Sequence, residues 1–124
     1  MKSFLKGKTI LVVDDVEDCF NLLDTILTFA EANTIWAKDG IEAIEICKSV
    51  THIDLALMDI RMPKMNGYDT SRKIKEIRPD LPIIIQSAYL VDYAMEKVFE
   101  AGCQDYISKP FTKERLYGVL EKYI

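Results

Sequence analysis

Five short apolar runs alternate along the chain with longer segments in which apolar residues recur at helical spacing. We expect the short runs to be β-strands, at residues 9–13, 34–37, 54–58, 83–86 and 105–108. We expect the longer segments to be helices, because their apolar residues recur three and four positions apart. These segments cover residues 16–30, the stretch around 41–47, about 69–78, 91–101 and 112–123. The continuous apolar character of the first run is typical of a strand buried on both faces.

Turn and capping residues stand where several predicted helices begin and end. Asp39-Gly40 is a turn signal, and Asp39 also suits the N-cap of the helix that follows. Thr112 suits the N-cap of the last helix. Pro79 ends the third helix, since proline cannot continue the hydrogen-bonding pattern, and Gly102 suits a helix C-cap. Between these elements the sequence has no linker, internal repeat or low-complexity tract.

The regular alternation of strand and helix predicts an α/β fold, with a parallel sheet covered by helices on both faces. The crossovers between successive strands are expected to be right-handed. A chain of 124 residues is one domain of ordinary size, so we take residues 1–124 as a single domain. In open sheets of this kind the working site lies beyond the carboxyl ends of the strands. The residues that follow the strands are therefore the first candidates for function.

Four of the five predicted strands run into residues that can handle a phosphoryl group. The first strand runs into Asp14-Asp15 and the third into Asp59. The fourth runs into Ser87 and the fifth into Lys109. If these strands are parallel neighbours, one edge of the sheet carries three carboxylates, a hydroxyl and an ammonium group.

Three carboxylates in one pocket repel one another. At about 4 Å and an effective dielectric constant near 20, each pair costs on the order of 4 kcal/mol. Either one carboxyl group is protonated, or a cation lies between them. Mg²⁺ fits the second option, because it takes oxygen ligands and is usually held by one or two carboxylates, waters and phosphate oxygens. Asp14, Asp15 and Asp59 therefore predict a magnesium site.

Asp59 is the candidate nucleophile, because it closes a central strand and a carboxylate can attack phosphorus to form an aspartyl phosphate. Lys109 would neutralise charge on the transferring group from the side opposite the metal. Ser87 offers a hydroxyl that can donate to a phosphoryl oxygen. Phosphoryl transfer asks mainly for positioning and charge stabilisation, and these residues supply both.

Each of these residues also has an ordinary structural interpretation when it is taken alone. Asp14, Asp15 and Asp59 each precede a helix or loop and suit a simple N-cap. Ser87 suits a turn, and Lys109 suits an exposed loop. Their joint occurrence at four strand ends is what favours the functional interpretation.

Composition narrows the classes of function. The net charge of −4 argues against a protein that binds the phosphate backbone of nucleic acids, so we expect no direct nucleic-acid partner. No apolar run approaches the roughly 18 residues of a membrane span, so we expect no membrane insertion. One basic cluster is expected to be the solvated face of a helix; it consists of Arg72, Lys73, Lys75 and Arg78.

The three cysteines are odd in number and widely spaced, at Cys19, Cys47 and Cys103. Without a Cys-x-x-Cys pair they suggest neither a redox motif nor a zinc site. Free thiols fit a reducing compartment, and the amino-terminal segment lacks the apolar region of a signal peptide. We therefore expect a cytoplasmic protein, with Cys19 and Cys47 as small core residues.

The strand-end residues belong to longer motifs that carry a family resemblance. The motifs are Val12-Val13-Asp14-Asp15, Met58-Asp59-Ile60-Arg61-Met62-Pro63-x-Met65-x-Gly67, Ser87-Ala88 and Ala101-Gly102-x-x-Asp105-Tyr106-x-x-Lys109-Pro110-Phe111. Together they resemble the receiver domain of two-component response regulators, and the match covers nearly the whole chain. Two departures are small: Ser87 stands where threonine is commoner, and Lys64 stands where a small residue is frequent.

The resemblance implies a flavodoxin-like, doubly wound sheet of five parallel strands in the order 2-1-3-4-5, flanked by five helices. It implies that Asp59 accepts a phosphoryl group from a histidine of a sensor kinase or a histidine phosphotransfer protein. It also implies that Mg²⁺, with Mn²⁺ as an alternative, binds Asp14, Asp15, Asp59 and the backbone carbonyl of Arg61.

The resemblance further implies that Ser87 and Lys109 contact the phosphoryl oxygens, and that the Lys109–Pro110 bond is cis. Phosphorylation adds roughly −1.5 to −2 charges and three acceptor oxygens. We expect Ser87 to move toward those oxygens and Tyr106 to turn inward into the vacated space. The surface of the fourth helix, fifth strand and fifth helix would then repack, which is a local event with a remote readout.

In this interpretation the chain is a bacterial signalling module and not an enzyme in its own right. We expect only Mg²⁺-dependent self-phosphorylation and slow self-dephosphorylation, and a monomer or a weak phosphorylation-dependent dimer. The downstream output protein or domain is unknown. The chain is either a free-standing regulator or a receiver cut from a larger regulator or hybrid sensor histidine kinase.

Two other classes of function compete with this one. A phosphatase that forms an aspartyl phosphate would usually have a second acid two positions after the nucleophile, where this chain has Arg61. A flavodoxin-like cofactor binder would have a hydroxyl- and glycine-rich phosphate loop after the first strand, where Asp14-Asp15 would repel phosphate.

Overall fold

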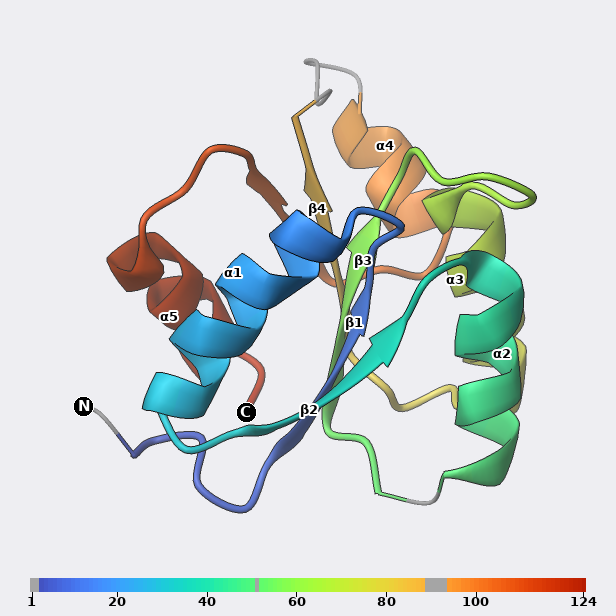
Figure 1. The fold of residues 1–124 in the computed structure, drawn as a ribbon. Helices are drawn as coiled ribbons and strands as arrows, with labels where there is room; N and C mark the ends of the chain where they lie inside the picture. Colours follow the sequence, from blue (N-terminus) through green and yellow to red (C-terminus); the bar gives the residue numbers. More distant parts are fainter. Residues whose placement is uncertain (1–2, 51, 89–93) are drawn as a thin grey trace.

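The structure is a computed structural model that describes residues 3–50, 52–88 and 94–124. Strands and helices alternate through these residues (Figure 1). The strands are β1 (Thr9–Val13), β2 (Asn33–Ala37), β3 (Leu55–Asp59), β4 (Ile83–Ser87) and β5 (Asp105–Ser108). The helices are α1 (Glu17–Phe29), α2 (Gly40–Ser49), α3 (Gly67–Ile77), α4 (Ala94–Glu100) and α5 (Lys113–Glu121).

All five strands form one parallel sheet in the order β2-β1-β3-β4-β5. Helices α1 and α5 cover one face of this sheet, and α2, α3 and α4 cover the other (Figure 1). The central strands β1, β3 and β4 are buried along their whole length, as their continuous apolar runs require. The flavodoxin-like, doubly wound fold predicted from the sequence is confirmed.

Alternate residues of the central strands pack into two separate cores. Val13 and Met58 belong to the core under α2, α3 and α4, whereas Val12 and Leu57 belong to the core under α1 and α5. Successive side chains of a strand point to opposite faces of a sheet. This alternation also decides on which face the polar residues at the strand ends lie. The residues two positions after Val12 and Leu57 lie on the face that α1 and α5 cover.

The predicted capping residues act as expected. Asp39 Oδ1 accepts a hydrogen bond of 2.8 Å from Glu42 N at the start of α2. Thr112 Oγ1 accepts one of 3.1 Å from Arg115 N at the start of α5. Gly102 follows α4 with a φ of +85°, a conformation that glycine adopts without strain.

The beginning of α3 differs from the prediction. The helix starts at Gly67 and not near 69, because Asn66 is its N-cap and accepts a 2.9 Å hydrogen bond from Asp69 N. Glycine is a poor helix former, which is why the sequence predicted a later start of this helix. The structure gives the reason for glycine: a Cβ at Gly67 would overlap the carbonyl oxygen of Asp59. Helix α3 thus lies directly against the end of β3.

The remaining boundaries shift by one or two residues. Strand β3 covers 55–59 and not 54–58, since the Asp54 carboxylate accepts a 2.8 Å hydrogen bond from Thr9 N below the strand. Strands β2 and β4 are each one residue longer than predicted, and α1 and α5 are shorter. The fourth helix was predicted to begin at residue 91, but residues 91–93 lie outside the described part of the chain. Among the described residues, α4 starts at 94.

The basic cluster of α3 is not simply a solvated face. Lys75 Nζ donates to the carbonyl of Leu81 at 2.8 Å, and Arg78 Nε donates to the carbonyl of Cys47 at 2.9 Å. These two side chains therefore tie α3 to the segments beside it. The prediction of a solvated face was wrong for them.

The cysteines divide into two kinds. Cys47 and Cys103 are buried core residues, whereas Cys19 is only partly buried, so the prediction of a core role was wrong for Cys19. Within residues 3–50, 52–88 and 94–124, no helix combines the length and the apolar character needed to cross a membrane.

Candidate functional site

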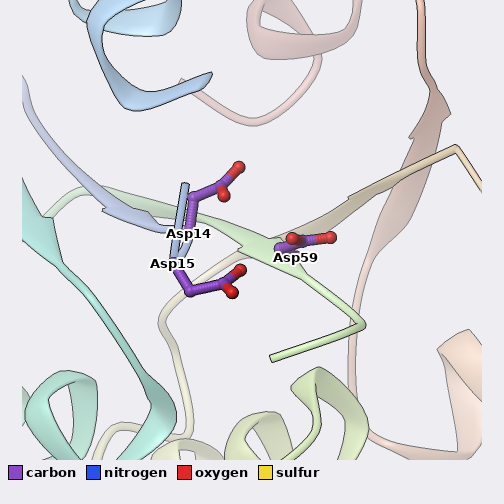
Figure 2. A group of neighbouring side chains, drawn as sticks. All are labelled: Asp14, Asp15 and Asp59. Atoms are coloured by element: carbon purple, nitrogen blue, oxygen red, sulfur yellow. The ribbon is translucent and has the colours of Figure 1, made fainter. Parts of the chain in front are cut away.

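The predicted acidic residues meet at the carboxyl ends of two neighbouring strands. Asp14 and Asp15 follow β1, and Asp59 is the last residue of β3, which pairs with β1 (Figure 2). One carboxylate oxygen from each of the three lies within 4.8 Å of the other two. The spatial convergence expected from the sequence is therefore present.

Asp14 is the most constrained member of the group, because its side chain is completely buried. Its Oδ1 accepts a 3.0 Å hydrogen bond from Val16 N. Its Oδ2 lies 3.2 Å from Lys109 Nζ and 3.4 Å from Gln86 Nε2. Asp14 is not the N-cap of α1: that position is Val16, which has no side-chain capping bond. The carboxylate instead lies between the sheet and the lysine.

Asp59 is 9% exposed, and its Oδ1 accepts a 2.9 Å hydrogen bond from Ile60 N. Burial raises the pKa of its carboxyl group to about 6, Lys109 opposes that shift, and the charge of Asp14 adds to it. Desolvation therefore outweighs the nearby ammonium. The group ionises near neutral pH, at a cost that an added cation would reduce.

Asp15 completes the group from the solvent side, since it is exposed whereas Asp14 and Asp59 are buried. A set of carboxylate oxygens with one open side fits a hard divalent cation that keeps some of its water ligands. The raised pKa of Asp59 is consistent with this fit, because crowded anions are stabilised by a cation between them. The donor set therefore suits Mg²⁺.

Ser87 and Lys109 reach the same rim from the other half of the sheet. Ser87 ends β4, is fully buried, and its carbonyl accepts a 2.9 Å hydrogen bond from Lys109 N. The Lys109–Pro110 peptide bond is cis, as the resemblance implied. The Lys109 side chain then turns to Asp14, which makes a 3.2 Å ion pair with it.

The two remaining predicted residues flank this group. Arg61 follows Asp59 and Ile60 in the loop before α3, and its side chain is exposed. Tyr106 is half-buried on β5, pairs with Ile85 of β4, and packs against the core under α2, α3 and α4. Their roles as metal ligand and switch residue stay predictions.

Sequence reasoning missed two neighbours of Asp14. Gln86 is completely buried on β4, and its signal was a polar residue at the end of an isoleucine run. Trp36 Nε1 donates a 2.8 Å hydrogen bond to the carbonyl of Asp14, and its ring stacks on Phe20 with centroids 4.9 Å apart. Nothing in the local sequence pointed to this bond, because it joins residues 22 positions apart.

A cavity of about 310 Å³ adjoins the site on the α1/α5 side. Most of its wall is apolar, and Gln86 and Lys109 line it together with Cys19 and Leu22 of α1. Burial raises the pKa of the Cys19 thiol, and the charge of Asp14 raises it further. Cys19 is thus a partly buried residue in the wall of this cavity.

The comparison with protein families agrees with this geometry. The model of the response regulator receiver domain matches residues 10–121, which is most of the chain. The chain belongs to the response regulator receiver domain family. It is a receiver domain of two-component signalling systems.

Curated relatives include proteins of very different length. The chain is 34% identical over 119 residues to the autoinducer 1 sensor kinase/phosphatase LuxN of Vibrio campbellii, covering 96% of this chain but only 14% of LuxN. It is 29% identical over 120 residues to the polar-differentiation response regulator DivK of Brucella ovis, covering 94% of this chain and 96% of DivK.

Among solved structures, the receiver domain of sensor histidine kinase PA1611 from Pseudomonas aeruginosa superposes with a TM-score of 0.86. It is 28% identical, and the match covers 94% of this chain and 97% of that one. That structure has a magnesium ion coordinated in the active site cleft. The similarity extends over the whole receiver fold.

Proposed function

We propose that this receiver domain accepts a phosphoryl group on Asp59 in a Mg²⁺-dependent reaction. The observation that carries the proposal is the convergence of three carboxylates with the Lys109 ammonium at one rim of the sheet. Phosphoryl transfer depends mainly on positioning and charge stabilisation. Asp59 ends the central strand β3, and burial raises the pKa of its carboxyl group.

The transfer step uses the ionised carboxylate of Asp59. One carboxylate oxygen attacks the phosphorus of a phosphohistidine, and the new O–P bond forms as the N–P bond breaks. The imidazole nitrogen leaves with the electron pair of that bond and takes a proton from solvent. The signal ends by hydrolysis of the aspartyl phosphate: water attacks the phosphorus, the O–P bond to Asp59 breaks, and inorganic phosphate leaves. A pKa of about 6 keeps the nucleophile mostly ionised at neutral pH.

Charge on the transferring group is balanced from two sides. Asp14, Asp15, Asp59 and the main-chain carbonyl of Arg61 would hold Mg²⁺, or Mn²⁺, which prefers the same kind of oxygen ligands. When bound, the metal supplies positive charge that offsets the charge developing on the phosphoryl oxygens. Lys109 supplies the second positive charge, and the Ser87 hydroxyl donates a hydrogen bond to a phosphoryl oxygen. Beyond slow self-phosphorylation by small donors and slow self-dephosphorylation, no separate enzyme activity is proposed.

The output of phosphorylation is a rearrangement that starts at Ser87. Its hydroxyl moves toward the new phosphoryl oxygens, and Tyr106 turns further into the space that Ser87 leaves. Tyr106 packs half-buried against the core under α4, which supports a change that spreads to the surface of α4, β5 and α5. The spectroscopic signal of the Tyr106 ring should change when a phosphoryl mimic is added, because the surroundings of the ring change. An unchanged signal would contradict this step.

The partners follow from the chemistry of the acceptor. The phosphoryl donor is a sensor histidine kinase or a histidine phosphotransfer protein, and the output protein or domain remains to be identified. The chain spans 14% of LuxN but 96% of DivK. Both contexts, a receiver within a longer kinase and a free-standing regulator, fit residues 1–124 as one receiver domain. We propose a cytoplasmic setting and a monomer or weak phosphorylation-dependent dimer.

The experiment that tests this function is incubation with acetyl phosphate and Mg²⁺, followed by intact-mass measurement. The wild-type chain should gain one phosphoryl group, and Asp59→Asn should gain none. Asp54→Asn is the matched control, because Asp54 lies at the opposite rim of the sheet and should leave phosphorylation unchanged. A wild-type chain that stays unmodified, or an Asp59→Asn variant that is still modified, would refute the assignment. A phosphatase would instead turn over many donor molecules per minute without holding the group.

A further inference from the structure

Gln86 is a buried polar side chain near the carboxyl end of β4, after a run of apolar residues. It is 0% exposed, follows three isoleucines on β4, and pairs in register with Asp59 on one side and Ile107 on the other. Alternation along β4 places it on the α1/α5 side, two residues after the core residue Ile84. An apolar residue would fit this position without any cost of removing an amide from water.

The Gln86 amide is only half satisfied among the described residues. Its Nε2 lies 3.4 Å from Asp14 Oδ2, whereas its Oε1 is buried without a hydrogen-bond partner. A buried acceptor left in this state destabilises the fold. Gln86 therefore has a net structural cost, and its one polar contact is with a predicted metal ligand.

Lys109 Nζ contacts the same oxygen. It lies 3.2 Å from Asp14 Oδ2, so Gln86 and Lys109 share one carboxylate oxygen of a fully buried residue. In the proposed function Lys109 has a second task, which is to neutralise a phosphoryl group on Asp59. The ammonium cannot keep its full interaction with Asp14 while it turns to that group. A buried carboxylate oxygen that loses the ammonium beside it is destabilised unless another donor stays in place.

We propose that Gln86 is a positioning residue that keeps Asp14 Oδ2 hydrogen-bonded when Lys109 moves to the phosphoryl group. This inference rests on the proposed function of Asp59 and Lys109. The cavity of about 310 Å³ that both Gln86 and Lys109 line gives the lysine side chain room to change position. The amide, in contrast, is fixed by a central strand and stays beside Asp14 in both states.

The test compares binding of Mg²⁺ alone with binding of a phosphoryl mimic. Trp36 is the only tryptophan and donates to the carbonyl of Asp14, so its fluorescence reports on the site directly. Titration with Mg²⁺ gives the metal affinity, and titration with beryllofluoride at saturating Mg²⁺ gives the affinity for the mimic. Lys109 needs to move only in the second titration.

Gln86→Met replaces the amide with an apolar side chain of similar length. We expect its Mg²⁺ affinity to stay within about twofold of wild type, and its beryllofluoride affinity to fall roughly fivefold to tenfold, equivalent to about 1 to 1.4 kcal/mol. Its stability in urea should be unchanged or higher, because the unpartnered Oε1 is gone. Gln86→Leu provides a second apolar replacement if the methionine variant does not fold.

Gln104→Met is the matched control. Gln104 is the other glutamine of the chain, and its Oε1 accepts a 2.8 Å hydrogen bond from Ile83 N at the opposite rim. This variant should lose stability and keep both affinities. Lys109→Met gives a further check: in that background Gln86→Met should change beryllofluoride affinity less than twofold, since no lysine leaves Asp14.

The outcomes separate the two proposals. If wild-type protein binds neither beryllofluoride nor a phosphoryl group, the proposed function itself fails. If wild type binds the mimic and Gln86→Met and Gln86→Leu bind it equally well, only the role of Gln86 is refuted. The role is also refuted if these variants lose Mg²⁺ affinity or stability in proportion to their loss of beryllofluoride affinity, because a residue with a purely structural role would give that result.

Discussion

At the amino-terminal rim of the sheet, the side chains of Asp54 and Gln104 each complete a main-chain hydrogen bond. Asp54 accepts from Thr9 N at 2.8 Å, and Gln104 accepts from Ile83 N at 2.8 Å. Each bond links a loop to the first residue of a neighbouring strand. The side chains of Asp54 and Gln104 at this rim therefore help to hold neighbouring strands in register.

The carboxyl-terminal rim uses the same residue types differently. Asp14, Asp59 and Gln86 are buried there with few donors, and burial raises the pKa of Asp59 to about 6. The Oε1 atom of Gln86 is buried without a partner among the described residues. Carboxylates that are crowded and desolvated are reactive and bind cations, but they cost folding free energy.

The difference between the rims indicates that the amino-terminal rim contributes mainly to stability and the carboxyl-terminal rim mainly to function. Substitutions at the amino-terminal rim should reduce stability and leave phosphorylation intact. Substitutions at the carboxyl-terminal rim should do the reverse. Proteins commonly violate local rules of stability at functional sites and compensate elsewhere.

The largest expected effect on stability comes from Asp59. Its carboxyl pKa is raised from 3.8 to about 6 on folding. Well below pH 3.8 the group is protonated in both the folded and unfolded chain and costs nothing. As the pH rises from about 4 to 6, the unfolded chain ionises first, so the folded state loses stability by up to about 3 kcal/mol. Asp59→Asn should recover roughly 2 to 3 kcal/mol at pH 7 and almost nothing at pH 3.5.

Urea unfolding in EDTA at the two pH values measures this effect. Adding Mg²⁺ should stabilise wild type more than Asp59→Asn, because the metal binds the folded state. Equal stability of the two chains at pH 7 would mean that burial of Asp59 carries no such cost, and the contrast between the rims would be lost.

A smaller and opposite effect is expected at the amino-terminal rim. Asp54→Ala removes the acceptor of Thr9 N, and a part-buried donor left without a partner costs about 1 to 2 kcal/mol. Urea unfolding should show this loss, while the rate of phosphorylation by acetyl phosphate should stay within about twofold of wild type. A large fall in that rate would indicate that the two rims are coupled.

The smallest expected effect concerns the protein surface beside the carboxyl-terminal rim, where a phosphoryl donor would dock. A protein donor must bring its phosphohistidine to Asp59, and Leu22 of α1 is 61% exposed beside the cavity that Lys109 lines. Leu22→Glu should slow phosphotransfer from a phosphorylated histidine phosphotransfer protein several-fold, because a charge there opposes apolar contact. Phosphorylation by acetyl phosphate should be unchanged. Equal slowing with both donors would point to damage of the site and not of a docking surface.

Much of the site was predictable because strand ends are marked in the sequence. Asp59 and Lys109 each follow an apolar run, and parallel strands bring their carboxyl ends to one edge. Gln86 was overlooked since its meaning depends on Asp14, which lies 72 residues away. The start of α3 was misplaced because Gly67 is explained by a close approach to Asp59 and not by local propensity.

By itself, the sequence determined the number and kind of the elements and the residues able to carry the chemistry, because hydrophobic periodicity and strand-end positions are local properties. Only the tertiary structure decided which charges are buried and which atoms share a partner. Asp14 and Asp15 are neighbours in the chain, yet the first is fully buried and the second is exposed. That difference arises from long-range contacts: the Asp14 carboxylate is desolvated beside Gln86 of β4 and Lys109, which lie 72 and 95 residues away in the chain.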